Sequence, residues 1–256
     1  MAVLFTAVIT WYGFKSASGK VFEEERGKST SVISLNNVEE NGSSPYIFGK
    51  SIEDAITDIE LKELPPSCIL EVPLVLQEPE LPTGCESVAL TMLLMYEGYE
   101  LEKTTVADEY LPYSANGDFS EGYIGDPYTY EGAGCFPPSL VEAADLFLEE
   151  HHSAKRAVNL TGRSLDELFH YIADGIPVAV WGTQYMTDTW LYEEGFSEGG
   201  IEYRWYENEH CIVLSGYDLE KGILMVNDSL VGVIERDLRG FEELYDMTGQ
   251  LAVAIL

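Results

Sequence analysis

A cysteine at the start of a long apolar segment is the residue of this sequence best placed to do chemistry. Cys85 follows a proline-marked loop, residues 77–84, and precedes the apolar run 87–96. This pattern predicts a helix that begins at Cys85. The first turn of a helix exposes unpaired N–H groups and a partial positive charge, which favour a thiolate over a thiol. We therefore predict that Cys85 is a nucleophile with a lowered pKa, more reactive than the other thiols.

A histidine and a carboxylate that could activate this thiol lie in the C-terminal part of the chain. Residues 209–229 hold two apolar runs separated by a polar turn, which predicts a β-hairpin. With Leu219 and Glu220 at the centre of the turn, His210 and Asp228 become direct cross-strand neighbours. Their Cβ atoms would then lie about 4.5–5.5 Å apart.

This pairing assigns a role to each polar group. Asp228 could hold one ring nitrogen of His210 and leave the other nitrogen for Cys85. Asn227 ranks second as the orienting group, because its side chain should point to the opposite face of the sheet. Gln77 lies on the loop before Cys85, so its side-chain amide and the Cys85 backbone N–H could together form an oxyanion hole.

These residues carry a resemblance to a known family. The chain resembles the papain-like cysteine peptidases, specifically the stand-alone C39-like branch related to the bacteriocin-leader processing peptidases. The matching blocks are residues 70–77, 81–94, 125–128, 134–138, 175–181, His210 with 213–217, and 226–228. The transporter portion to which leader-processing enzymes are fused is missing from this sequence, which argues against their double-glycine leader as the substrate.

The resemblance implies both a fold and an activity. It implies an α+β fold, with an N-terminal helical part that carries the nucleophile and a C-terminal antiparallel sheet. It also implies a thiol-dependent peptidase without a cofactor. In that peptidase Cys85 is the nucleophile, His210 the general base and acid, Asp228 the orienting group and Gln77 the oxyanion donor.

The order of the predicted elements agrees with an α+β fold, because helices come first and strands dominate later. Capping-box pairs, Ser139 with Glu142 and Ser164 with Glu167, predict the starts of two helices. Further strands are predicted at residues 176–181, 231–236 and 250–255, and a short helix at residues 241–245.

Two loops could line a substrate cleft. Residues 184–209 are rich in aromatic side chains, and residues 113–134 are rich in Gly and Tyr. The first is either a lid over the cleft or a surface hairpin whose aromatic side chains pack on the domain, and the second could form the opposite wall. Trp181 and Trp205 are the candidates for substrate contacts.

The chain divides into an N-terminal segment, residues 1–65, and a peptidase-like domain, residues 66–256. Residues 2–14 are apolar and uncharged, shorter than the roughly 20 residues of a membrane span but within the range of a signal-peptide core. The alternative is an ordinary strand at residues 3–11. Residues 21–63 are acidic and indicate a spacer. We therefore expect export or membrane anchoring, and an extracellular or cell-envelope location.

Charge and cysteine spacing exclude several classes of function. The chain has 14 basic and 45 acidic residues, a formal net charge of −31, which argues against nucleic-acid binding. Its four cysteines lack the paired spacing of zinc sites, so no metal site is predicted. At most one disulfide could form among Cys68, Cys135 and Cys211.

The predicted partner is a peptide or protein substrate, and we expect a monomer. Two alternatives to the peptidase remain at this stage. One is an envelope binding module that keeps the fold without turnover, and the other is a transpeptidase or amidase that uses the same groups. The presence of all four candidate residues favours an enzyme.

Overall fold

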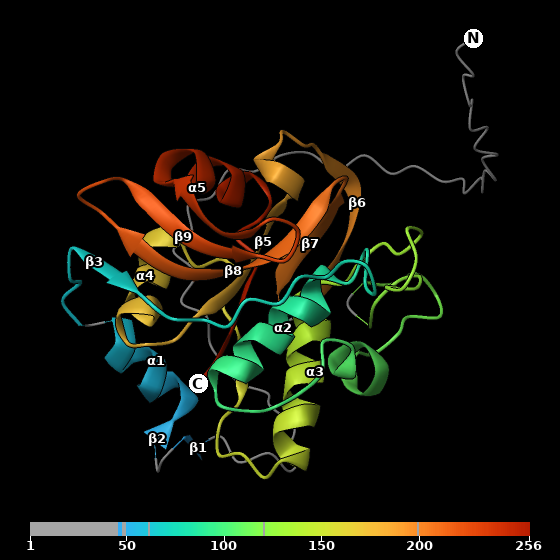
Figure 1. Cartoon of the computed structure of the whole chain (residues 1–256), viewed down its shortest axis with the longest axis horizontal. Coiled ribbons are helices and arrows are strands. Elements are labelled where there is room, and N and C mark those ends of the chain that lie inside the picture. Colours follow the sequence, from blue (N-terminus) through green and yellow to red (C-terminus); the bar gives the residue numbers. More distant parts are fainter. Residues whose placement is uncertain (1–45, 48–49, 61, 120, 199) are drawn as a thin grey trace, which may run out of the picture. The chain divides into compact units, whose positions relative to one another are not determined.

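The computed structural model describes residues 46–47, 50–60, 62–119, 121–198 and 200–256 (Figure 1). The helices are α1 (Ile52–Glu60), α2 (Cys85–Tyr96), η1 (Val106–Tyr110), α3 (Pro137–Glu150), α4 (Leu165–Ala173), η2 (Gln184–Met186) and α5 (Leu238–Met247). The strands are β1 (Tyr46–Ile47), β2 (Lys50–Ser51), β3 (Ser67–Ile69), β4 (Ala157–Asn159), β5 (Val178–Thr183), β6 (Leu191–Glu198), β7 (Ile201–Tyr206), β8 (Glu209–Asp218), β9 (Ile223–Asp228), β10 (Gly232–Asp237) and β11 (Ala252–Ile255).

A seven-stranded antiparallel sheet is the centre of the fold. Six of its strands follow the order β10-β9-β8-β5-β11-β4. The seventh, β3, pairs with the C-terminal end of β8. Two smaller sheets consist of β1 with β2 and of β6 with β7. Helices and an antiparallel sheet are thus combined as the α+β prediction requires.

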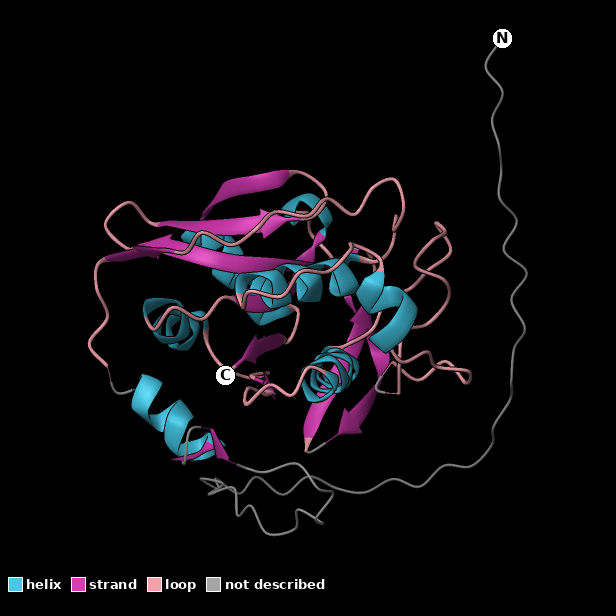
Figure 2. Cartoon of the chain, turned by 60° about the horizontal axis from the view of Figure 1, so that its bottom comes forward, coloured by secondary structure: helices cyan, strands magenta, loops and turns pink. Residues whose placement is uncertain are grey.

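Helices cover both faces of the main sheet, so its central strands are apolar on both sides (Figures 1 and 2). Along β8, Cys211 and Val213 pack into the core that contains α2 and α3. Ile212 and Leu214 pack into the core that contains α1, α4 and α5. This alternation is the two-residue period of a strand, here with both faces buried.

The two predicted capping boxes have different outcomes. The box at α4 is confirmed, because the Ser164 side chain accepts from Glu167 N–H and Glu167 accepts from Ser164 N–H. The box at Ser139 is wrong, since α3 begins earlier, at Pro137, where a missing N–H costs the helix nothing. Ser139 Oγ donates to Phe119 O at 3.1 Å instead.

The aromatic segment before β8 is a β-hairpin, formed by β6 and β7, whose side chains pack on the domain. Tyr203 and Tyr206 are buried, and the Tyr203 ring stacks on Phe196 with their centroids 4.9 Å apart. The segment is thus the packed hairpin of the two alternatives, and part of it also lines a cavity described below.

The predicted spacer is structured where the structure describes it. Helix α1 falls within residues 21–63, and its Ile59 is buried in the same core as Leu168 and Ile172 of α4. The predicted apolar segment at residues 2–14 and the spacer up to residue 45 lie outside the described residues. Within the described part of the chain, no helix has the length and apolar character that crossing a membrane demands.

Candidate active site

Cys85 is the first residue of α2, as the sequence predicts. The loop before it is held in place by Gly84 N–H, which donates to Leu81 O at 3.0 Å, and by Tyr123 OH, which donates to Thr83 O at 2.7 Å. A Cβ on Gly84 would come within 3.0 Å of the Leu81 Cβ. A small residue therefore lets the loop close tightly against the start of the helix.

The hairpin that carries His210 and Asp228 forms, but its register differs from the predicted one. Val213 faces Asn227 and Asp218 faces Ile223, with a bulge between Leu214 and Gly216. The turn is centred on Glu220 and Lys221, one residue later than assumed, and the one-residue bulge in β8 offsets only part of this shift, so His210 is not directly opposite Asp228. The two residues share one face of the sheet as diagonal neighbours, which are still within reach of long side chains.

His210 and Asp228 meet across this diagonal. Nε2 of His210 lies 2.8 Å from Oδ1 of Asp228, and both side chains are buried. The same carboxylate accepts from Leu230 N–H at 2.9 Å and from Arg236 Nη2 at 3.4 Å. Burial opposes ionisation of Asp228, but the His210 hydrogen bond, together with Leu230 and Arg236, outweighs it and lowers the pKa of the carboxyl.

Asn227 has a different partner. Its Nδ2 donates to Val72 O at 2.9 Å, on the segment that leads to Gln77. It makes no hydrogen bond to His210 among the described residues. Asn227 therefore ties the loop to the sheet, and Asp228 is the group that contacts the imidazole.

Gln77 is held by hydrogen bonds to both ends of its amide. Oε1 accepts from Ser229 Oγ at 2.6 Å, and Nε2 donates one hydrogen to Pro82 O at 2.7 Å. The Gln77 backbone N–H also donates to Ser229 O at 3.0 Å. These contacts leave the second Nε2 hydrogen for another acceptor. Ser229 was not singled out from the sequence, although it directly follows Asp228.

One cavity of about 200 Å³ brings Gln77, Cys85 and His210 together. Its remaining lining residues are Pro82, Thr83, Gly132, Ala133, Gly134, Gln184, Trp205, Asn208 and Glu209. The loop that ends at Gly134 and the segment around Trp205 thus both line it. Trp181 does not, because it is fully buried and donates from Nε1 to Cys135 O at 3.1 Å. Its predicted role in substrate contact is therefore wrong.

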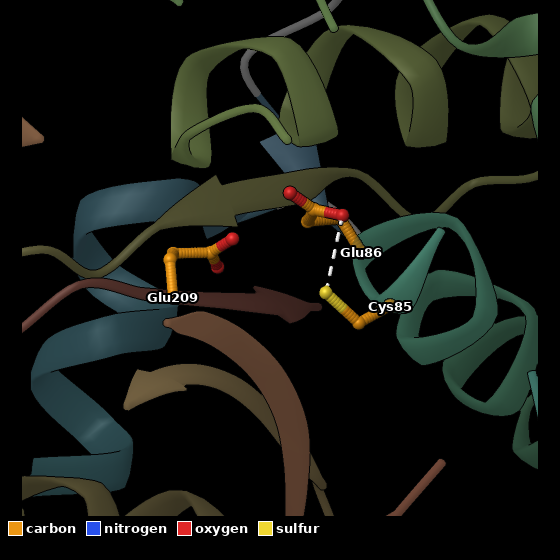
Figure 3. Close-up of side chains that lie close together, drawn as sticks. All are labelled: Cys85, Glu86 and Glu209. Carbon is orange, nitrogen blue, oxygen red and sulfur yellow. Dashed lines mark hydrogen bonds between the residues drawn. The ribbon is translucent and has the colours of Figure 1, made fainter. Parts of the chain in front are cut away.

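The Cys85 thiol points toward carboxylates. Its Sγ donates to Glu86 Oε2 at 3.3 Å, and a carboxylate oxygen of Glu209 lies within 4.8 Å of the sulfur (Figure 3). Among the described residues, no hydrogen bond joins Cys85 to His210. Burial, then the charges of Glu86 and Glu209, raise the pKa of the Cys85 thiol well above its usual value. The predicted lowering of this pKa is wrong in this conformation, because burial and the two carboxylates oppose ionisation.

Glu86 and Glu209 are the residues that the sequence analysis missed. Burial raises the pKa of Glu86 to about 7. Burial and the neighbouring Glu86 raise the pKa of Glu209 well above its usual value. The sequence contained a signal for them. Glu86 directly follows the candidate nucleophile, and Glu209 directly precedes the candidate base.

The arrangement contains the groups that acyl transfer requires. A thiol, an imidazole oriented by a carboxylate, and an amide N–H donor line one small cavity. Because Asp228 occupies Nε2 of His210, Nδ1 is the nitrogen available to take a proton from the thiol. Proton transfer to His210 first requires the thiol to break its hydrogen bond with Glu86.

Comparisons with known proteins relate this chain to the C39-like peptidases. The model of the Peptidase_C39 like family matches residues 69–253. The uncharacterized protein YvpB of Bacillus subtilis (strain 168) is 30% identical over 188 residues, which cover 69% of this chain and 70% of YvpB. The crystal structure of a candidate C39-like peptidase from Bacillus anthracis aligns with a TM-score of 0.62 and 28% identity, over 74% of this chain and 97% of that one.

A more distant structure is that of a double glycine motif protease from an AMS/PCAT transporter, solved in complex with the leader peptide. It aligns over 74% of this chain and 92% of that one, with a TM-score of 0.41 and 13% identity. A likeness of this size carries no argument about substrate.

Proposed function

This chain belongs to the Peptidase_C39 like family, and on that premise we propose that it is a cysteine peptidase that hydrolyses peptide bonds. The observation that carries the proposal is the 2.8 Å contact between His210 Nε2 and Asp228 Oδ1, beside a cavity that also contains Cys85 and Gln77. This contact leaves Nδ1 of the imidazole as a base for the thiol.

The reaction would proceed through a thioester. Cys85 Sγ attacks the carbonyl carbon of the peptide bond while its proton moves to Nδ1 of His210. The resulting oxyanion accepts hydrogen bonds from the Cys85 backbone N–H and from Nε2 of Gln77. His210 returns the proton to the leaving amine, and the thioester forms. Water then attacks the thioester, His210 takes a proton from it, and the carboxylic acid and the free thiol are released.

The position of Cys85 explains why a base is needed. In the resting conformation the sulfur is buried, and its pKa is raised rather than lowered. A thiol of this kind is a weak nucleophile until His210 removes its proton. We therefore expect peptide substrates, which fill the cavity and draw the sulfur toward His210, to react faster than small alkylating agents.

Aromatic side chains next to the cavity would bind the substrate. Trp205 lines both the cavity with Cys85 and an adjoining one of about 540 Å³, whose lining includes Phe119, Phe136 and Phe196. Its indole stacks on Phe119 with centroids 4.6 Å apart. The second cavity would accept a bulky apolar side chain of the peptide.

The location belongs to the same proposal. We propose an extracellular or cell-envelope enzyme that acts as a monomer on peptides or proteins, with residues 2–14 as the export or anchoring segment. The acidic composition, with a net charge of −31, supports this environment. Fractionation of cells that express the full chain, compared with a chain without residues 2–14, tests it.

A peptide electrophile tests the catalytic proposal. A peptidyl ketone that traps thiols should modify Cys85 in preference to the partly exposed Cys68, and Cys85→Ala should abolish both labelling and hydrolysis of a quenched fluorescent peptide library. His210→Ala should have the same effect on hydrolysis. Labelling of Cys85 without any hydrolysis would refute the peptidase and favour the binding module.

A further inference from the structure

A cluster at the cavity joins the nucleophile to two carboxylates that have no role in the proposed reaction. It consists of Cys85, Glu86 and Glu209, and the sulfur and one oxygen of each carboxylate lie within 4.8 Å of one another (Figure 3). Glu86 belongs to the first turn of α2, and Glu209 is the first residue of β8. The three side chains point toward a common centre from two different elements.

The two carboxylates are buried without a compensating cation. Glu86 exposes 0% of its surface and Glu209 exposes 7%. Within the part of the chain that the structure describes, neither makes an ion pair with a basic side chain. Burying two carboxyl groups together is costly unless they are protonated or bind a metal ion.

The hydrogen bonds of the cluster leave one oxygen unused. Oε1 of Glu86 accepts from Cys135 N–H at 2.7 Å, and Oε2 accepts from Cys85 Sγ at 3.3 Å. Oε1 of Glu209 is buried and has no hydrogen-bond partner among the described residues. A buried oxygen that lacks a hydrogen-bond partner calls for an explanation, and its carboxylate belongs to a cluster that could ligate a metal ion.

The backbone around the cluster is shaped to the carboxylates. At Gly134, an added Cβ would lie 2.5 Å from Glu86 Oε1 and 2.9 Å from Glu209 Oε2, and the φ of +102° also favours glycine. The backbone at Gly134 therefore lies close against both carboxylates, and a larger residue would not fit there. The cavity of about 200 Å³, which Cys85, Gly134 and Glu209 all line, provides an entry path.

We propose that Cys85, Glu86 and Glu209 form a binding site for a divalent metal ion of the zinc type. Thiolate and carboxylate groups are both ligands of Zn²⁺, which is usually four-coordinate, whereas Mg²⁺ and Ca²⁺ prefer oxygen ligands alone. The fourth position would open to the cavity and hold water. The sequence lacks a zinc spacing, because the three ligands come together only in the folded chain.

Metal binding would have a consequence for reactivity. The metal displaces the thiol proton, which is released to solvent. It then holds the sulfur on the Glu86 side, away from His210. This inhibitory consequence depends on the proposed peptidase function, whereas binding of the metal itself does not.

Cadmium provides a direct test of the site in full-length, metal-free protein. Titration with Cd²⁺ should produce a thiolate-to-cadmium charge-transfer band that saturates at one ion per chain and is lost in Cys85→Ser. Glu209→Gln should weaken binding by at least about 100-fold, since even changes beyond the ligands cost roughly 10–100-fold. The matched control Glu235→Gln removes an exposed carboxylate on β10 and should bind Cd²⁺ as the parent protein does.

Protection from alkylation provides an independent measurement. Zn²⁺ should slow iodoacetamide labelling of Cys85, and the ratio of rates without and with Zn²⁺ should fall to about one in Glu209→Gln. If Glu209→Gln does not fold, as judged by circular dichroism, Glu86→Gln replaces it, because its amide oxygen can still accept from Cys135 N–H.

The experiments distinguish failure of the metal site from failure of the proposed peptidase function. Unchanged Cd²⁺ affinity in a folded glutamate variant, or a band that Cys68→Ser rather than Cys85→Ser removes, overturns the site. The cluster would then be a carboxyl pair that shares a proton. Normal Cd²⁺ binding by a protein that, in its metal-free form, cleaves no peptide would refute the proposed function and leave the metal site intact.

Discussion

Replacement of Asp228 by Asn tests how His210 is activated. Nε2 of His210 lies 2.8 Å from Oδ1 of Asp228, and the two side chains expose only 2% and 3% of their surface. Asn has the same shape as Asp but carries no charge. The variant therefore removes the negative charge that stabilises the imidazolium formed when His210 takes the thiol proton.

The size of the effect follows from the geometry of this contact. A buried hydrogen bond to a charged group contributes about 1.5–3 kcal/mol, and 1.36 kcal/mol corresponds to a factor of ten in rate. Acylation of Cys85 should therefore be roughly 10- to 150-fold slower in Asp228→Asn. The fold should survive, because the Asn side chain can still accept from Leu230 N–H, which lies 2.9 Å from Oδ1 in the parent protein.

The assay is the second-order rate at which a peptidyl ketone modifies Cys85, followed by mass spectrometry. Glu235→Gln, an exposed change on β10, is the control and should not alter the rate. Asn227→Ala should destabilise the protein, since Val72 O loses its donor, but should change the rate less than Asp228→Asn. An unchanged rate in Asp228→Asn together with a large loss in Asn227→Ala would refute the assignment of Asp228.

Three further predictions concern the oxyanion donor, the domain boundary and the carboxyl pair. Gln77→Ala should lower peptide hydrolysis by about 10²–10³-fold but leave the rate of iodoacetamide labelling of Cys85 unchanged, because alkylation forms no oxyanion; equal losses in both assays would contradict this role. Ile59→Ala should lower the free energy of unfolding in urea by about 2–4 kcal/mol, since Ile59 is buried in the core with α4; a neutral result would place α1 outside the folded domain. Burial raises the pKa of Glu86 from 4.5 to about 7, so its contribution to stability is fully present below pH 4.5 and is lost as the pH rises through 7. In metal-free protein the free energy of unfolding should fall by about 3 kcal/mol over this range, and Glu86→Gln should flatten the profile; an identical slope in the variant would show that Glu86 does not titrate there.

Local patterns in the sequence determined the elements that carry the site. The apolar run after a proline-marked loop predicted the helix that starts at Cys85, and the Ser164 and Glu167 pair predicted the start of α4. The two apolar runs around a polar turn predicted the hairpin of β8 and β9. These features depend on backbone geometry and on neighbours within a few residues, so the chain itself contains the necessary information.

Register and exposure could not be predicted in the same way. The turn of the hairpin is centred one residue later than assumed, which moves His210 away from its expected place opposite Asp228, and the bulge between Leu214 and Gly216 recovers only one residue of the shift. Trp181 was predicted to contact substrate, but β5 is central in the sheet and buries this side chain completely. Both errors concern neighbours on other strands.

The direction of the pKa shift of the Cys85 thiol depends on the tertiary structure alone. A helix start favours a thiolate in isolation, but packing α2 against β8 buries Cys85 beside Glu86 and Glu209 and raises its pKa. Charge–charge interactions depend on distance and on the loss of water, and both are set by segments far apart in the chain. The sequence by itself therefore determined which groups are available for chemistry, and the fold decided which of them meet and in what state of protonation.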